Sequence, residues 1–304
     1  MYIFPIKDII SKDIFSYHLY ADDTQLYTKF QPNELENVKS SVSECTIDVN
    51  NWMSKNKLKM NTDKTEIILC GTSQKLNTLD INNVVIGDES VYFSQSVKNL
   101  GVYLDQNLNL NVHISNVRRS CYFEIRNISK FRHYINEKAA IQLIISLVLS
   151  KLDYCNSLFY NMSNENFKKL QTVQNHAARV ISKANKRSSA HPILKKLHWL
   201  PIRQRVSYKI SIMVFKCLND SSFPSYLKEL ICVYTPSRQL RSSCDKFLLS
   251  KPRMKLATFG QRSFYYAAPN VWNALPYELR SCNELQTFKK LLKTHFFKIA
   301  FDHV

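Results

Sequence analysis

The hydrophobic pattern changes its period near residue 110, and this change constrains the fold more than any other feature. Before it, short runs of aromatic and β-branched residues alternate with turn-forming residues, which is typical of antiparallel strands. After it, apolar residues recur at steps of three and four, as on one face of an amphipathic helix. The sequence therefore predicts an α+β protein that begins with a small antiparallel sheet and continues as a mainly helical region.

Strand signals are concentrated in the first part, and short possible strands are also predicted in a basic loop region at residues 234–253. Residues 15–30 carry strand-forming residues on both sides of Ala21-Asp22-Asp23-Thr24, which predicts a hairpin with that tetrapeptide as its connection. A second hairpin is predicted around Gly87-Asp88. Residues 66–70 and 100–104 read as further strands, and Gly101 would lie inside the second of these.

Helices are predicted wherever the three-and-four spacing persists. One covers the sheet, and the others fill the chain beyond residue 110, with Phe131 expected on an inward face and Trp199 and Trp272 expected as core residues. The predicted helices span residues 35–52, 111–132, 137–152, 164–181, 203–218 and 284–301. A basic linker at 183–189 then suggests three regions, at residues 1–109, 110–185 and 186–304.

The charge is distributed as unevenly as the secondary structure. Residues 1–110 hold 10 lysines against 14 acidic residues, whereas residues 111–304 hold 32 basic residues against 10 acidic ones. Such an excess predicts a polyanionic partner, RNA or DNA, for the helical region. The alternative is a basic face that only contacts solvent.

Several other classes of protein are disfavoured. The 8 cysteines form no CxxC pair and no zinc-ligand spacing, so buried free thiols are expected. The 4 glycines form no phosphate-binding loop, and no small-molecule cofactor is expected. The N-terminus lacks a signal-peptide pattern, and the most apolar stretch, residues 139–149, is about half the length that spans a bilayer. An intracellular protein of the nucleus or cytoplasm, without a membrane segment, is therefore expected.

The tetrad Tyr20-Ala21-Asp22-Asp23 carries the clearest chemical signal. A hairpin tip projects two acids beyond the sheet, where water and phosphate groups can reach them. Carboxylates in such a position can hold the divalent metal that nucleotidyl transfer requires. Two adjacent acids in a turn are by themselves more often structural than metal-binding. The residues around them therefore decide between these two interpretations.

That context resembles the reverse transcriptases of non-LTR (LINE-type) retrotransposons, of the jockey and chicken-repeat groups. The segment HLYADDTQLY is similar to their palm motif C, Asn56–Thr65 to motif D, and Lys98–Asp105 to motif E. Three later blocks, QNHAAR at 174–179, LHWLP at 197–201 and the stretch from Arg262 to Pro276, resemble C-terminal blocks of the same elements. The resemblance spans nearly the whole chain and implies a partial palm, a helical thumb and a mainly helical C-terminal region.

The family implies a role for each matching position. Asp22 and Asp23 would be catalytic and bind Mg²⁺, and Lys64 would be a catalytic proton donor to the leaving pyrophosphate. Primer or nucleic-acid contacts are implied for a larger set, and Arg132 is expected to join it as a phosphate ligand. This set is Tyr20, Leu100, Gly101, Val102, Arg118, Arg119, Tyr122, Arg126 and Lys130.

The family's motif A, with a further aspartate, and its glycine-rich motif B have no counterpart in this sequence. Because two-metal chemistry needs carboxylates from both sides, Mg²⁺ binding is expected to be weak or absent here, and this chain alone is expected to be inactive. Three interpretations stay open: a fragment of an RNA-directed DNA polymerase, a non-catalytic module that binds RNA or DNA through residues 111–304, and an inert product of a decayed element. The oligomeric state is not predicted.

Overall fold

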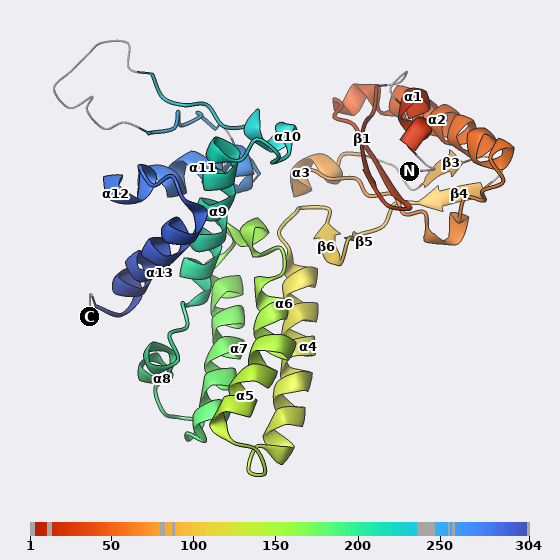
Figure 1. Cartoon of the computed structure of the whole chain (residues 1–304). Helices are drawn as coiled ribbons and strands as arrows, with labels where there is room; N and C mark the ends of the chain where they lie inside the picture. Colours follow the sequence, from red (N-terminus) through yellow and green to blue (C-terminus); the bar gives the residue numbers. More distant parts are fainter. Residues whose placement is uncertain are drawn as a thin grey trace. The chain divides into compact units, whose positions relative to one another are not determined.

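The computed structural model describes residues 4–10, 14–79, 83–86, 89–235, 247–254, 256 and 259–302. The chain divides into two compact units, Met1–Asn109 and Leu110–Val304 (Figure 1). The first combines strands with helices, and the described elements of the second are helices apart from one bridge between Val233 and Leu249, so the predicted α+β class is confirmed.

The strands of the first unit form three separate antiparallel hairpins instead of one sheet. Each strand has four or five residues, and each pairs only with its neighbour in the sequence. The strands are β1 (Ser16–Tyr20), β2 (Asp23–Tyr27), β3 (Asn83–Ile86), β4 (Glu89–Tyr92), β5 (Ser96–Asn99) and β6 (Val102–Asp105). The two predicted hairpins are confirmed in their strands, while the turn residues Gly87 and Asp88 lie outside the described residues.

Two strand predictions were wrong. Gly101 does not lie inside a strand but in the turn between β5 and β6, where Leu100 (φ 43°) and Gly101 (φ 83°) both adopt left-handed backbone conformations. A two-residue turn of this kind matches the twist of the flanking strands. Residues 66–70 form no strand and take part in only a single bridge among the described residues, between Ile67 and Phe93.

Helix α2 (Leu35–Lys55) supplies much of the core of the first unit. Its residues Cys45 and Val49 pack with Ile6, Ile10 and Phe15. Each fully buried aliphatic side chain of this kind contributes about 1.5–3 kcal/mol. The remaining helical elements are short: η1 (Phe4–Ile6), α1 (Lys7–Ile10), η2 (Pro32–Glu34), η3 (Thr62–Lys64) and α3 (Ser73–Leu76).

In the second unit, three helical segments run side by side (Figure 1). They are α4 (Asn111–Phe131), the run of α5 (Glu137–Ile144), the π-helical η4 (Ile145–Leu149) and α6 (Ser150–Asp153), and α7 (Asn164–Ser182). The predicted helices at these positions are confirmed. Ile114, Cys121, Ile125 and Ile128 of α4 are buried, but Phe131 is 38% exposed because it ends the helix, so its inward placement was wrong.

Helix α9 (Ile202–Asn219) joins this bundle to the rest of the unit, contacting α7 on one side and α11 (Phe264–Asn273) and α13 (Leu285–Phe301) on the other. Phe215 and Phe288 stack there with ring centroids 4.5 Å apart. Trp199 and Trp272 are both buried, as predicted. The shorter elements are η5 (Asn156–Phe159), α8 (His191–Lys196), α10 (Ser225–Lys228), η7 (Gly260–Arg262) and α12 (Tyr277–Arg280).

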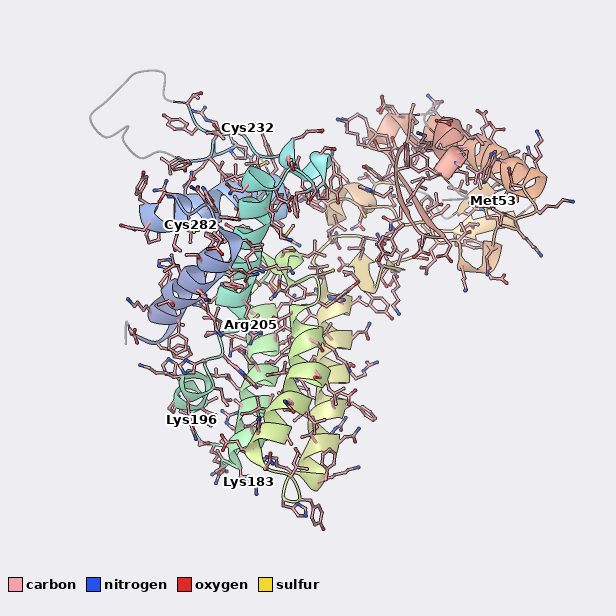
Figure 2. All side chains as sticks on the ribbon, in the orientation of Figure 1. Met53, Lys183, Lys196, Arg205, Cys232 and Cys282 are labelled. Carbon is pink, nitrogen blue, oxygen red and sulfur yellow. The ribbon has the colours of Figure 1, made fainter. Side chains whose placement is uncertain are left out.

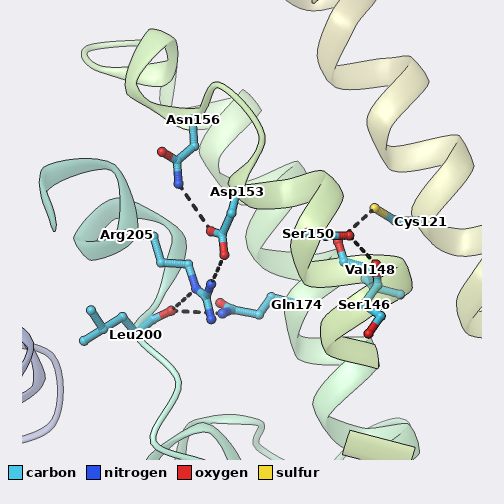
Figure 3. A network of polar contacts seen from close by, with 9 residues as sticks. All are labelled: Cys121, Ser146, Val148, Ser150, Asp153, Asn156, Gln174, Leu200 and Arg205. Atoms are coloured by element: carbon cyan, nitrogen blue, oxygen red, sulfur yellow. Dashed lines mark hydrogen bonds and ion pairs between the residues drawn. The ribbon is translucent and has the colours of Figure 1, made fainter. Parts of the chain in front are cut away.

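A polar network fixes the segment between α8 and α9 (Figure 3). The main-chain oxygen of Leu200 accepts hydrogen bonds from Gln174 Nε2 at 2.9 Å and from Arg205 Nε at 2.8 Å. Arg205 also forms an ion pair with Asp153 at 2.6 Å, and Asn156 donates to the same carboxylate. Residues of the QNHAAR and LHWLP blocks therefore have a structural role, since they tie α6, α7 and α9 together.

The thiols fit the expectation in part. Among the described cysteines, Cys45, Cys121 and Cys217 are buried as predicted, whereas Cys70 and Cys232 are exposed, contrary to the prediction. Among the helices in the described part of the chain, none combines the length and the apolar character needed to span a membrane.

Candidate functional site

The acid pair lies at the tip of the first hairpin. Tyr20 pairs with Asp23, which leaves only Ala21 and Asp22 in the turn, and Ala21 adopts a left-handed backbone conformation (φ 54°). Asp23 thus begins β2, so the connection is shorter than the predicted tetrapeptide. Both carboxylates are exposed, and the Tyr20 side chain is 65% exposed. The pair is open to solvent and to any ligand that approaches the tip.

A hydrogen bond connects this hairpin to the one that resembles motif E. Gln25 Nε2, on β2, donates to Asn99 Oδ1, the last residue of β5. Directly after Asn99, Leu100 is 39% exposed in the turn, whereas Val102 is only 5% exposed and belongs to the core. Of the three predicted contacts on this hairpin, Leu100 and Gly101 therefore lie at its tip and Val102 does not.

Lys64 occupies the end of η3, where its side chain is exposed. Within the described residues it forms no ion pair with a carboxylate, Asp22 and Asp23 included. Its role as a proton donor stays a prediction.

The acid pair does not complete a metal site. Over the residues that the structure describes, no three His, Cys, Asp or Glu side chains come close enough to hold a metal ion. Asp22 and Asp23 offer carboxylates from one hairpin tip only, and two-metal sites are clamped from two sides. Asp22 and Asp23 would therefore form one side of such a site.

Four of the predicted phosphate ligands form an exposed basic face on α4: Arg118, Arg119, Arg126 and Lys130. Tyr122 lies on the same helix, but its ring already has two protein neighbours. The Arg118 guanidinium lies 5.6 Å from the ring centroid, and His176 meets the ring edge-on at 5.4 Å. The cations are available to a polyanion, while stacking of Tyr122 on a base would require these contacts to change.

Arg132 does not belong to this basic face, and its predicted role in binding phosphates was wrong. It is 7% exposed and donates to the main-chain oxygens of Val180 (3.1 Å), Ile181 (2.5 Å) and Ile135 (2.8 Å). The last carbonyl groups of a helix lack partners within the helix and favour a nearby cation. Arg132 satisfies those of α7, so its role is structural.

The structure reveals a second basic feature that the sequence did not predict, a hollow of about 780 Å³ in the second unit. It is bounded by α7, by the loop that follows it, by α8 and by the start of α9. Figure 2 labels Lys183, where α7 ends, and Lys196, the last residue of α8. The basic side chains that line the hollow are Lys168, Arg179, Arg187, His191 and Arg203.

Positive charge from this region also acts on a nearby imidazole. Partial burial, followed by the charges of Arg179 and Lys186, lowers the pKa of His176 below its ordinary value. The sequence showed Lys168 and Arg179 on an outward face of one helix, but it could not show that Arg187 and Arg203 converge on that face.

Comparisons with known proteins give no family. A scan against family models and searches of curated proteins and of solved structures found no match to this chain.

Proposed function

We propose that the first unit is part of the palm of a non-LTR retrotransposon reverse transcriptase, from motif C onward, and that Asp22 and Asp23 are its acid pair. The observation that carries this proposal is the exposure of both carboxylates at the tip of the β1–β2 hairpin. The hydrogen bond from Gln25 to Asn99 supports it further, because it joins the hairpins that resemble motifs C and E.

In this proposal the reaction is RNA-directed DNA synthesis. The two carboxylates would supply negative charge that holds divalent metal against phosphate oxygens. Since the described residues provide no third ligand, the opposing carboxylate must come from another polypeptide segment. The expected result is that the 304-residue chain makes no DNA on a primed RNA template.

The test begins with the genomic DNA that precedes the first codon. If an open frame there encodes an aspartate-bearing strand and a glycine-rich segment, the extended protein should lengthen a primer on an RNA template. Replacing Asp22 or Asp23 by asparagine should then reduce the rate at least about a hundredfold, as loss of a pre-positioned electrostatic group does. Asp48→Asn, which changes an exposed acid on α2, is the matched control.

Undiminished synthesis by the Asp22→Asn and Asp23→Asn variants of the extended protein would contradict the proposal. Stop codons or frameshifts in the preceding DNA would favour an inert product of a decayed element instead.

A second candidate function, binding of RNA or DNA without catalysis, is favoured by the basic face of α4. Its four cations are exposed, and within the described residues none of them pairs with a carboxylate; Glu124 of the same helix pairs with Lys151 instead. The variant Arg119→Gln/Arg126→Gln/Lys130→Gln should weaken binding and reduce the slope of log affinity against log salt by about 2 for a single strand. An affinity that does not depend on salt would exclude this function.

A further inference from the structure

We propose that the basic hollow bounded by α7, α8 and the start of α9 binds the phosphodiester backbone of a single-stranded nucleic acid. This site is separate from the acid pair and from the basic face of α4, and the inference holds whether or not the chain is a polymerase fragment.

The first argument is charge. Lys168, Arg179, Arg187 and Arg203 line the hollow, and no acidic residue does so among those that the structure describes. In the same part of the chain, none of the four cations lies within ion-pair distance of a carboxylate. Glu165, the acid of α7, is bound to Lys169 at 2.7 Å. The positive charge of the hollow is therefore not neutralised by the protein, and it favours an anionic ligand.

The second argument is the spacing of the cations. Lys168 and Arg179 lie on one face of α7, together with Asn175. At about 1.5 Å per residue, the helix separates the two basic positions by about 16 Å. A strand with several phosphates can contact both ends of the row, whereas one phosphate group can reach only one end.

The third argument is that two of the cations are already held in place. The Arg203 guanidinium lies 4.1 Å from the ring centroid of Phe167 and donates to Asn164 Oδ1. Arg179 Nε donates to the main-chain oxygen of Ser188 at 2.9 Å, which leaves its two terminal nitrogens for a ligand. Side chains that are fixed before binding lose little freedom when the ligand arrives.

The loop that carries Arg187 is ordered by its own hydrogen bonds. The Ala184 amide donates to Arg179 O at 3.0 Å, and the Arg187 amide donates to Asn185 Oδ1 at 3.1 Å. The Ser188 amide donates a hydrogen bond to Asn185 O at 3.0 Å. This arrangement places Arg187 at the hollow beside α7, together with Lys168, Arg179 and Arg203. In this proposal the four cations contact backbone phosphates irrespective of base sequence.

The test uses the full chain and 12-nucleotide oligo(U) and oligo(dT) labelled with fluorescein, with binding followed by fluorescence anisotropy. The variant Lys168→Gln/Arg187→Gln removes two exposed cations for which the described residues show no side-chain partner. We expect at least about tenfold weaker binding and a salt slope reduced by about 1.4, since each phosphate contact on a single strand contributes about 0.7.

The matched control is Lys138→Gln/Lys290→Gln, which removes the same charge from exposed positions that do not line the hollow. It should change the affinity less than threefold. A second measurement needs no variant: acetylation of Lys168 in the wild-type chain should be suppressed by oligo(U), and acetylation of Lys138 should not.

Three results would overturn the inference. The first is binding of both oligonucleotides by Lys168→Gln/Arg187→Gln with the affinity and salt slope of the wild type. The second is equal reactivity of Lys168 with and without oligo(U), which decides the question even if the variant does not fold. The third is that inorganic pyrophosphate displaces the oligonucleotide and protects Lys168 as strongly as the strand does, which would indicate a small phosphate ligand. Preference for oligo(U) over oligo(dT), or the reverse, identifies which nucleic acid the hollow accepts.

Discussion

Asn99 accepts a hydrogen bond from the side chain of Gln25, a residue 74 positions earlier in the sequence. The bond joins two hairpins that share no main-chain pairing and belong to separate two-stranded sheets. Short isolated hairpins are marginally stable in water, so such links between them contribute to the order of the first unit.

Replacing either partner should therefore loosen the first unit. Gln25→Ala and Asn99→Ala should each lower the free energy of unfolding by about 1 kcal/mol, the usual net contribution of one hydrogen bond. The double variant should cost less than the sum of the two, because the second replacement removes no further bond. Urea titration of the four proteins gives the coupling energy, and a strictly additive result would show that the bond contributes nothing.

Arg132 should prove to be a stability residue. Arg132→Ala should lower the free energy of unfolding by about 2–4 kcal/mol, because it leaves the buried carbonyl groups at the end of α7 without donors. Arg119→Ala, at an exposed position of α4, should stay within about 0.5 kcal/mol of the wild type. Equal effects of the two substitutions in urea titration would refute the assignment.

The thiol of Cys121 should make stability depend on alkaline pH. Burial raises its pKa to about 11 from the ordinary value of 9.0, so the folded chain keeps the proton that the unfolded chain loses first. The free energy of unfolding should therefore fall as the pH rises from 9 toward 11, by at most about 1.4 kcal/mol per pH unit from this group.

Cys121→Ala removes this contribution, so its stability should fall less steeply over the same pH range. Urea titrations of both proteins at pH 8, 9 and 10 measure the difference, and Cys232→Ala, at an exposed position, is the control. Parallel pH profiles for Cys121→Ala and the wild type would contradict the prediction.

His176 should report the positive charge near the basic hollow. Burial is the main cause that lowers its pKa, and Arg179 and Lys186 lower it further. Arg179→Gln should therefore raise the pKa of His176, Lys186→Gln should raise it less, and Lys138→Gln should leave it unchanged. An NMR titration of the imidazole between pH 4.5 and 8 measures the shifts.

The same shift has a consequence for stability at low pH. Since protonation of His176 is disfavoured in the folded chain, stability from this group is present above pH 6.5 and is lost as the pH falls through the folded-state pKa. Arg179→Gln should reduce that loss. An unchanged pKa in this variant would mean that the arginine does not act on the imidazole.

The sequence predicted those helices and hairpins whose formation depends on residues close together in the chain. The hairpin of residues 15–30 was predictable because strand-forming residues flank a turn, and the helix α4 because its apolar residues recur at helical spacing. Gly101 was misplaced for a reason of the same kind: the run 100–104 looks like a strand, and only the left-handed backbone at Leu100 shows that the strand begins after the glycine.

What the sequence did not predict depends on contacts between distant segments. Arg132 follows a basic helix and looked like a phosphate ligand, but its acceptors are 48 and 49 residues away. The basic hollow likewise requires Arg187 and Arg203 to reach the face of α7 that carries Lys168. Helical spacing identifies which residues point outward, but not which other segment they meet.

The main-chain oxygen of Leu200 accepts two hydrogen bonds, and this affects the thermodynamics of binding at the neighbouring hollow. With two donors engaged, the peptide group before Pro201 cannot rotate without breaking both bonds, so this wall of the hollow keeps its shape when empty. The loss of conformational entropy on association then falls on the nucleic acid and on exposed side chains such as Lys168 and Arg187, and less on this part of the backbone. Strands whose bases already stack, such as oligo(A), have less of that entropy to lose and should bind more tightly than oligo(U) of the same length.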